Sequence, residues 1–197
     1  MNVKLALALT AALAASPLLP AADIALPAPD RTGGMPLMQT LNQRKSARAY
    51  AEKQLPSQTV SDLLWAASGV NRPDGRMTAP TARNIQEITL YAILPSGAYR
   101  YDAKANRLAQ VSSENLTQSV TGKAPLTVVY VADTKKQPNL KMSAVDCGFI
   151  GQNIYLYCAS AGLSTVIRGS FDKGFISKLN LPEGSEVFFI QSVGFPK

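Results

Sequence analysis

The chain has 197 residues, of which 46% are hydrophobic and 17% are charged, a composition that is typical of a folded domain and excludes an intrinsically disordered protein. Its 20 basic and 13 acidic residues give a formal net charge of +7, but the basic residues are scattered, which argues against a nucleic-acid-binding protein. The absence of histidine excludes imidazole-based triads and most catalytic metal sites, so we expect no metal site and expect a cofactor to supply the chemistry.

The first segment has the pattern of a cleavable secretory signal. Lys4 precedes an apolar run from Leu5 to Leu19, and small residues follow the run. Two prolines break this run, which makes it too short to span a membrane comfortably. The sequence therefore predicts a signal peptide over 1–22, a periplasmic or otherwise exported protein, and no stable membrane insertion after its removal. An uncleaved N-terminal anchor is the alternative.

One folded domain is predicted after the signal. Residues 23–34 are rich in Pro and Gly and predict an extended arm, and the domain occupies 35–197. A short helix is predicted over 36–44. A second helix begins with Ser57 as its N-cap, carries apolar residues at i, i+3, i+4 and i+7, and ends at Gly69.

The rest of the chain predicts a long loop and then a mixture of strands and helices. The loop over 70–87 is rich in Pro, Gly and Asn, and loops of this length inside a compact domain are usually functional or disordered. The elements that follow are a hairpin with strands at 88–94 and 98–102, an apolar central strand at 126–132, a long helix at 142–161 that ends before Gly162, a shorter helix at 171–179 and a strand at 187–193. This order favours an α+β layered domain.

Both cysteines fall within the predicted long helix. Eleven residues separate Cys147 from Cys158, which corresponds to about 16 Å along a helix, whereas the alpha carbons of a disulfide lie within about 7 Å of each other. The two cysteines share a helical stripe with Ile150, Ile154 and Ala161. We therefore expect two free, buried thiols, although export would permit a disulfide.

The first candidate binding segment reads Arg44-Lys45-Ser46-Ala47-Arg48 and follows the first predicted helix. Two arginines four residues apart can converge on one phosphate group if the segment is helical or turns tightly, and the serine hydroxyl between them suits phosphate oxygens. Taken alone, the pattern is more typical of a solvated basic stretch.

The second candidate segment lies in the long loop and contains Pro80, Thr81, Ala82 and Asn84. The proline stiffens the loop, the small side chains allow close approach of a flat ring, and Asn84 offers a donor and an acceptor to a uracil-like ring edge. Taken alone, this segment is typical of an ordinary loop.

The third candidate segment contains Ile167, Arg168 and Gly169, between the long helix and the next predicted helix. The glycine could bring a backbone N–H close to a ligand. A plain connection is the simpler interpretation of these residues taken alone.

Together, the three segments resemble the nitroreductase family of FMN flavoproteins, most of all the branch related to azoline-oxidizing dehydrogenases. The similar pieces cover nearly all of the chain after the signal, in the order of the family. They are RKSARAY at 44–50, DLLWAASGVNR at 62–72, RMTAPTARNIQEITLYAI at 76–93, GAYRYDAKANRL at 97–108, APLTVVYVAD at 124–133, DCGFIGQNIYLYCASAGLSTVIRGSFD at 146–172 and QSVGFPK at 191–197. The resemblance implies a nitroreductase-like α+β fold, with a central, mostly antiparallel sheet flanked by helices, and a domain-intertwined homodimer.

The resemblance also implies a role for each segment in holding non-covalent FMN. Arg44, Ser46 and Arg48, with Lys45 between them, would grip the phosphate and the ribityl chain. The loop of Pro80, Thr81, Ala82 and Asn84 would pack on the isoalloxazine ring that the other subunit binds. The turn of Ile167, Arg168 and Gly169 would point a backbone amide toward flavin N5, with Arg168 where the family often has Glu, and Lys197 would be the basic residue that many members place near the C-terminus.

The activity that the resemblance implies is an FMN-dependent oxidoreductase working by ping-pong hydride transfer. A small-molecule donor, NADH or NADPH in most of the family, would reduce the flavin, and a nitroaromatic, quinone or similar acceptor would reoxidise it. No side chain is expected to be catalytic, because the chemistry belongs to flavin N5. The alternatives are a flavin-dependent dehydrogenase of a small or peptide substrate, a non-catalytic flavin-binding member of the family, and a basic binding protein without a cofactor.

Overall fold

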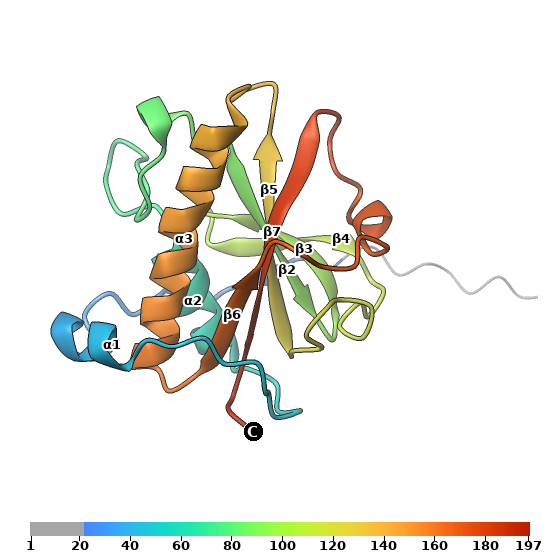
Figure 1. The fold of residues 1–197 in the computed structure, drawn as a ribbon. Helices are drawn as coiled ribbons and strands as arrows, with labels where there is room; N and C mark the ends of the chain where they lie inside the picture. Colours follow the sequence, from blue (N-terminus) through green and yellow to red (C-terminus); the bar gives the residue numbers. More distant parts are fainter. Residues whose placement is uncertain (1–21) are drawn as a thin grey trace, which may run out of the picture.

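The computed structural model describes residues 22–197, so the predicted signal peptide lies, apart from its last residue, outside the described residues. A seven-stranded sheet forms the centre of the fold (Figure 1), in the order β1-β4-β3-β2-β5-β7-β6, and each pair of neighbouring strands is antiparallel. The strands are β1 (Ile24–Ala25), β2 (Ile88–Leu94), β3 (Gly97–Asp102), β4 (Arg107–Ser112), β5 (Leu126–Asp133), β6 (Ser164–Arg168) and β7 (Ser185–Gly194). This arrangement confirms the predicted α+β fold with a mostly antiparallel central sheet.

Helices accompany the sheet near the predicted positions. The α-helices are α1 (Leu37–Gln43), α2 (Ser57–Ser68) and α3 (Leu140–Ser160), and there are two short 3₁₀ helices, η1 (Ala82–Asn84) and η2 (Ile176–Leu179). The three α-helices confirm the predicted helices at 36–44, between the Ser57 cap and Gly69, and at 142–161, each to within two residues. No helix in the part of the chain that the structure describes is long and apolar enough to cross a membrane.

The two faces of the sheet are covered in different ways. α2 and α3 pack against each other and cover one face, where Leu64, Tyr130 and Ile150 belong to the larger hydrophobic core. The opposite face is covered by the chain before β5 and after β6, through side chains such as Leu116 and Phe175 in the smaller core. α3 therefore lies between the sheet and the surface on the face where the candidate site is built.

α3 confirms the expected state of the cysteines. Cys147 and Cys158 are fully buried and free. Ala161, which the predicted stripe included, follows the helix and is exposed. Gly151 lets α3 approach the sheet closely, because a Cβ atom at this position would lie only 3.0 Å from Ile167 Cδ1 of β6.

Three local predictions are wrong. Ser57 is the first residue of α2 rather than its N-cap, and no side chain caps this helix. The helix predicted at 171–179 is instead a turn, in which Asp172 Oδ1 accepts a hydrogen bond from Gly174 N at 2.8 Å, followed only by η2. The segment at 164–168, predicted as part of a connection, is the edge strand β6.

Candidate functional site

The first candidate segment runs along the edge of the sheet and reaches the C-terminus. Ala47 N donates a hydrogen bond to Thr165 O of β6 at 2.9 Å. Tyr50 forms an isolated β-bridge with Pro196, so Lys197 lies next to this segment in the fold. The structure thus gathers in one region the predicted phosphate-binding residues Arg44, Lys45, Ser46 and Arg48 and the C-terminal Lys197.

Tyr155 of α3 connects the first candidate segment to the third. Its hydroxyl lies 2.8 Å from Ser46 Oγ and accepts a hydrogen bond from Ile167 N at 3.2 Å. The guanidinium of Arg44 lies over the Tyr155 ring, 5.2 Å from its centre. One buried tyrosine therefore joins two segments that the sequence separates by more than a hundred residues.

Arg168 directs its side chain away from α3. Ile167 faces α3, and side chains alternate along a strand, so the Arg168 guanidinium lies on the opposite face of the sheet. Its Nη1 donates to Ser192 Oγ at 2.8 Å. The Arg168 guanidinium also lies near Tyr50, where its charge opposes the rise in the Tyr50 pKa that burial causes. On the α3 side, this segment can therefore bind a ligand only through its backbone, in the stretch that leads to the exposed Gly169.

The second candidate segment, which includes η1, is held by the other end of α3. Ala82 N donates a hydrogen bond to Asp146 Oδ2 at 2.9 Å, and Asp146 is 2% exposed. Asn84 N donates to Thr81 O at 2.9 Å, and Asn84 has a φ of 57°, a left-handed conformation that Asn tolerates better than most residues. Pro80 and Asn84 are exposed, so this loop presents its polar and rigid residues outward.

The length of α3 separates the second segment from the other two. Asp146 and Tyr155 are nine residues apart on this helix, which corresponds to about 14 Å along its axis. In Figure 1, η1 lies near one end of α3, whereas the chain that follows α1 crosses near the other end. Within one chain, the structure therefore brings together the first and third segments and leaves the second apart from them.

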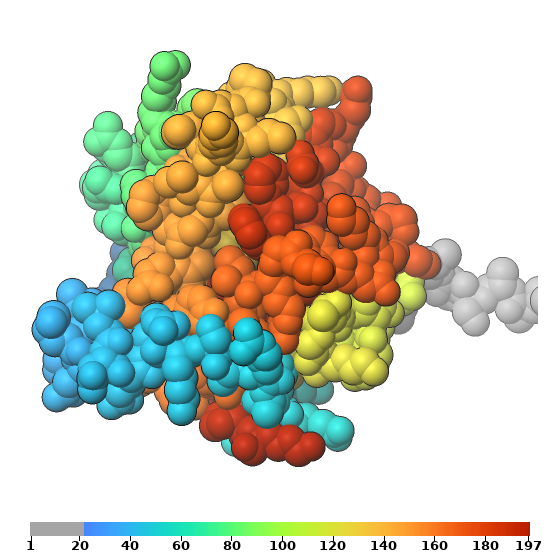
Figure 2. Space-filling model, in the orientation of Figure 1, coloured from blue at the N-terminus to red at the C-terminus, as the bar shows by residue number. Residues whose placement is uncertain are grey.

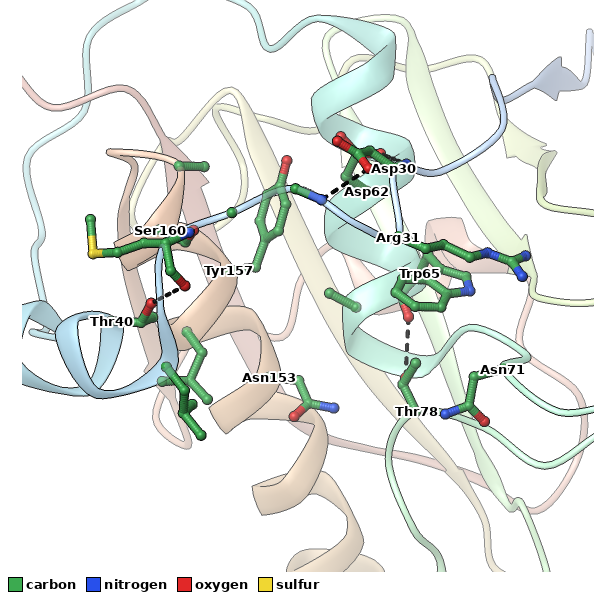
Figure 3. Close-up of a pocket in the computed structure, with 17 residues that line it drawn as sticks. Asp30, Arg31, Thr40, Asp62, Trp65, Asn71, Thr78, Asn153, Tyr157 and Ser160 are labelled. Atoms are coloured by element: carbon green, nitrogen blue, oxygen red, sulfur yellow. Dashed lines mark hydrogen bonds between the residues drawn. The ribbon is translucent and has the colours of Figure 1, made fainter.

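Two cavities adjoin α3, and a single predicted binding residue, Lys45, lines one of them. A cavity of about 500 Å³ lies beside the first segment, and its lining includes Lys45 and Tyr155. The larger cavity, of about 560 Å³, lies between the arm, α2 and the C-terminal half of α3 (Figure 3). Tyr157 lines it, and Arg31 is stacked over Trp65 at 5.2 Å. The lining of this larger cavity contains none of the predicted binding residues, so we do not assign it as the candidate functional site.

Apolar side chains are exposed on α3 and on α1. Both helices lie at the surface on the face that Figure 2 shows. Phe149 is 44% exposed and Val145 is 50% exposed. The spacing of three and four residues places them with Met142 on one stripe of α3. Apolar side chains that gather on an exposed surface are typical of interaction sites. The exposed large apolar side chains are Leu37, Met38 and Leu41 of α1 and Leu140, Met142, Val145 and Phe149 of α3.

The family model described as "Nitroreductase family" matches residues 41–195. The chain belongs to the nitroreductase family. A crystal structure of a "putative nitroreductase" from Ralstonia eutropha JMP134 is 40% identical, has a TM-score of 0.83, and the match covers 89% of this chain and 90% of that chain. The family consists of oxidoreductases that generally bind flavin and act on small molecules.

Two less similar solved structures share the nitroreductase fold. The FMN-dependent nitroreductase of Clostridium difficile R20291 is 19% identical, with a TM-score of 0.57, and the match covers 81% of this chain and 87% of that chain. A chain of the E. coli microcin synthetase McbBCD complex with truncated pro-MccB17 is 16% identical, with a TM-score of 0.67, and the match covers 80% of this chain and 73% of that chain. The second likeness agrees, at the level of the fold, with the branch of the nitroreductase family that the sequence resembles.

The sequence did not reveal the residues that connect the three segments of this nitroreductase-family chain. Tyr155 lies inside the predicted long helix, where nothing in the local pattern distinguishes it from other apolar helix residues. Asp146 and Glu87 are charged residues at positions where burial could not be predicted. The only signal that could have found Asp146 is the helical spacing, which places it next to the buried Cys147 and one turn before Ile150.

Proposed function

We propose that this protein is an exported, FMN-dependent oxidoreductase that transfers hydride by a ping-pong mechanism from a nicotinamide or other small-molecule donor to a nitroaromatic, quinone or similar acceptor. The observation that carries the proposal is the meeting of Ser46 and Ile167 at the Tyr155 hydroxyl. This contact joins the segment suited to a phosphate with the segment whose glycine can bring a backbone N–H close to a ligand. Membership in a family that generally binds flavin supports FMN as the ligand.

The residues present fit a phosphate-bearing cofactor. Arg44, Lys45 and Arg48 form no ion pair with an acidic side chain within residues 22–197, so their charges are available to a dianionic phosphate. Ser46 adds a hydroxyl, and Lys197 lies close by through the pairing of Pro196.

The protein's contribution to the reaction is binding and orientation. Bound FMN would supply the hydride acceptor and donor. The exposed backbone at Gly169 would hydrogen-bond the ring, and the first segment would neutralise the phosphate. The candidate segments contain Arg, Lys, Ser, Thr and Asn but no group with an ordinary pKa near 7, so no side chain is assigned a proton-transfer step.

A homodimer would complete the site. A twofold axis crossing α3 midway between Asp146 and Tyr155 would pack the two α3 helices antiparallel at Phe149, where the exposed apolar stripe lies. The 80–84 loop of the partner, held at the Asp146 end of its helix, would then reach the Tyr155 end of this one. The same contact would bury the apolar stripe, which favours association.

The absorption spectrum of the purified mature protein tests the proposed function. We expect flavin absorbance, either as purified or after reconstitution with FMN, and bleaching on anaerobic addition of NADH or NADPH. A protein that stays colourless after reconstitution contradicts the proposal. Reduction by dithionite but by neither nicotinamide would retain the flavoprotein and replace the donor with another small molecule.

A further inference from the structure

Two buried carboxyl groups lie where the η1 segment, β2 and α3 meet. Glu87, the residue before β2, is 1% exposed, and Asp146 of α3 is 2% exposed. Asp146 Oδ2 accepts the hydrogen bond from Ala82 N, whereas neither carboxyl oxygen of Glu87 has a hydrogen-bond partner within residues 22–197. An ionised carboxylate that is buried without donors is strongly destabilising, so the charge state of Glu87 requires an explanation.

The groups that surround Glu87 offer it no cation. Ser143 and Asp146 face it from α3, and Cys147 lies next to both carboxyls. Asp133, at the end of β5, is engaged in its own turn, where Oδ1 accepts two backbone N–H groups. No lysine or arginine among residues 22–197 forms an ion pair with either buried carboxyl. Burial above all raises the pKa of Glu87, and the Asp146 charge adds to the rise, whereas the nearby backbone N–H of Glu87 and the Ser143 hydroxyl oppose it.

One proton can satisfy both carboxyls. As two carboxylates they are acceptors only and repel each other, whereas a protonated carboxyl can donate to an ionised one. We propose that Glu87 keeps its proton at neutral pH and donates it to Asp146, and that this pair positions the 80–86 loop through the hydrogen bond from Ala82 N. Glu87 is thus a positioning residue. Its effect on flavin rests on the proposed function, but the shared proton does not.

Removal of the proton should destabilise the fold as the pH rises. Unfolded Glu87 titrates at its ordinary pKa of 4.5, and the folded pKa lies above that value, so the folded state holds a proton that the unfolded state has released. The stabilisation is fully present below pH 4.5 and is lost as the pH rises through the folded pKa. Between the unfolded and the folded pKa of Glu87, the unfolding equilibrium constant should rise by up to about tenfold per pH unit.

The composition of the chain makes this window easy to observe. It contains no histidine, and burial raises the pKa of the Cys147 thiol to about 12, so neither titrates between about pH 5 and about pH 8. The test is urea unfolding at several pH values in this range, followed by the fluorescence of Trp65, the single tryptophan. We expect stability to decline across this range. A wild-type protein whose unfolding constant is independent of pH there overturns the proposal.

Three substitutions test whether Glu87 and Asp146 cause the decline in stability. Glu87→Gln should abolish it, because the amide can donate to Asp146 at every pH, whereas the same change at the exposed Glu186 should leave it intact. Asp146→Asn keeps an acceptor for Ala82 N but removes the like charge, so the decline should move to lower pH. A decline that survives Glu87→Gln, or that Glu186→Gln also abolishes, overturns the assignment.

Flavin binding provides the second readout. Because the FMN phosphate itself titrates at about pH 6, the readout is the comparison of the two proteins. Relative to the Glu87→Gln variant, the wild type should bind FMN less tightly as the pH rises through this range. If unfolding responds to Glu87→Gln but FMN affinity shows the same pH dependence in both proteins, the pair stabilises the fold without positioning the loop, and the positioning role is overturned. Failure of both proteins to bind FMN would instead refute the proposed function, while the unfolding data still decide the shared proton.

Discussion

Replacing Tyr155 with Phe tests whether one hydroxyl joins two parts of the site. The change deletes the hydrogen bond with Ser46 Oγ and leaves the partly buried Ile167 N–H without its acceptor. Ser46 is exposed and can bond water instead, so most of the cost falls on Ile167. We expect the free energy of unfolding to fall by about 1–3 kcal/mol, the cost of an unpaired buried donor.

The same substitution should also weaken FMN binding. With the hydroxyl absent, Ser46 loses the contact that fixes its orientation, and the loss of one hydrogen bond of about 0.5–1.5 kcal/mol corresponds to roughly a two- to tenfold rise in the FMN dissociation constant. Urea unfolding and fluorimetric titration with FMN measure the two effects. Tyr157→Phe is the matched control, because Tyr157 lies two residues along α3 on the wall of the other cavity (Figure 3). Equal effects of the two substitutions on FMN affinity would refute the reasoning.

Four further outcomes follow from the proposed site. Arg44→Ala and Arg48→Ala should each raise the FMN dissociation constant roughly ten- to a hundredfold, because a charge-assisted phosphate contact contributes about 1.5–3 kcal/mol, whereas Arg100→Ala on the exposed surface of β3 should not. Phe149→Asp should convert dimers into monomers in sedimentation and reduce flavin retention; unchanged dimers would exclude the α3 interface. Intact-mass measurement on protein from its native compartment should show loss of about the first 20 residues, and a full-length cytosolic protein would exclude export. Steady-state kinetics with varied NADH and a quinone should give parallel double-reciprocal lines, and intersecting lines would exclude the ping-pong mechanism.

Local patterns predicted the elements whose burial follows a simple rule. α2 was predicted because its apolar positions repeat with helical spacing, and β5 because a continuous apolar run fits a strand buried on both faces. β4 and β6 were not predicted. β4 carries Arg107 and Gln110 and is mostly only partly buried, and β6 has just five residues directly after a helix. β6 is an edge strand, and β4 is bordered on one side only by the two-residue β1. Such segments become strands through pairing with a neighbour, and their own composition does not reveal it.

The incorrectly predicted helix at 171–179 shows that a side-chain hydrogen bond can override a periodic apolar pattern. Phe171, Phe175 and Leu179 are spaced by four, as on one face of a helix, and the last two are indeed buried in the smaller core. The Asp172 carboxylate accepts the N–H of Gly174 instead of leaving it to a helix, and this side-chain bond fixes a turn. The burial was therefore predictable, whereas the backbone conformation was not.

The candidate site was predictable as segments but not as an assembly. The residue pattern indicated the three segments, the resemblance to a family gave each a role, and the structure places the first beside the third. The residues that join them act only in the folded state: Tyr155 by reaching across to Ser46, and Asp146 by capturing Ala82 N. Their roles depend on which face of α3 meets which neighbour, and a single sequence does not specify that.

Two glycines lie within α3, and packing within the described residues explains one of them but not the other. Glycine inside a helix is less favourable than alanine by about 0.5–1 kcal/mol. At Gly151 the compensation lies within the chain, because a Cβ atom would crowd Ile167 Cδ1 and hold α3 away from the sheet. At Gly148 a Cβ atom would meet no atom of the described residues within 4 Å. Packing within the described residues therefore gives no reason for Gly148, whereas in the proposed dimer the partner's helix would approach this backbone beside the exposed Phe149. This position lies between Asp146 and Tyr155, where the proposed dimer would join the two halves of the site.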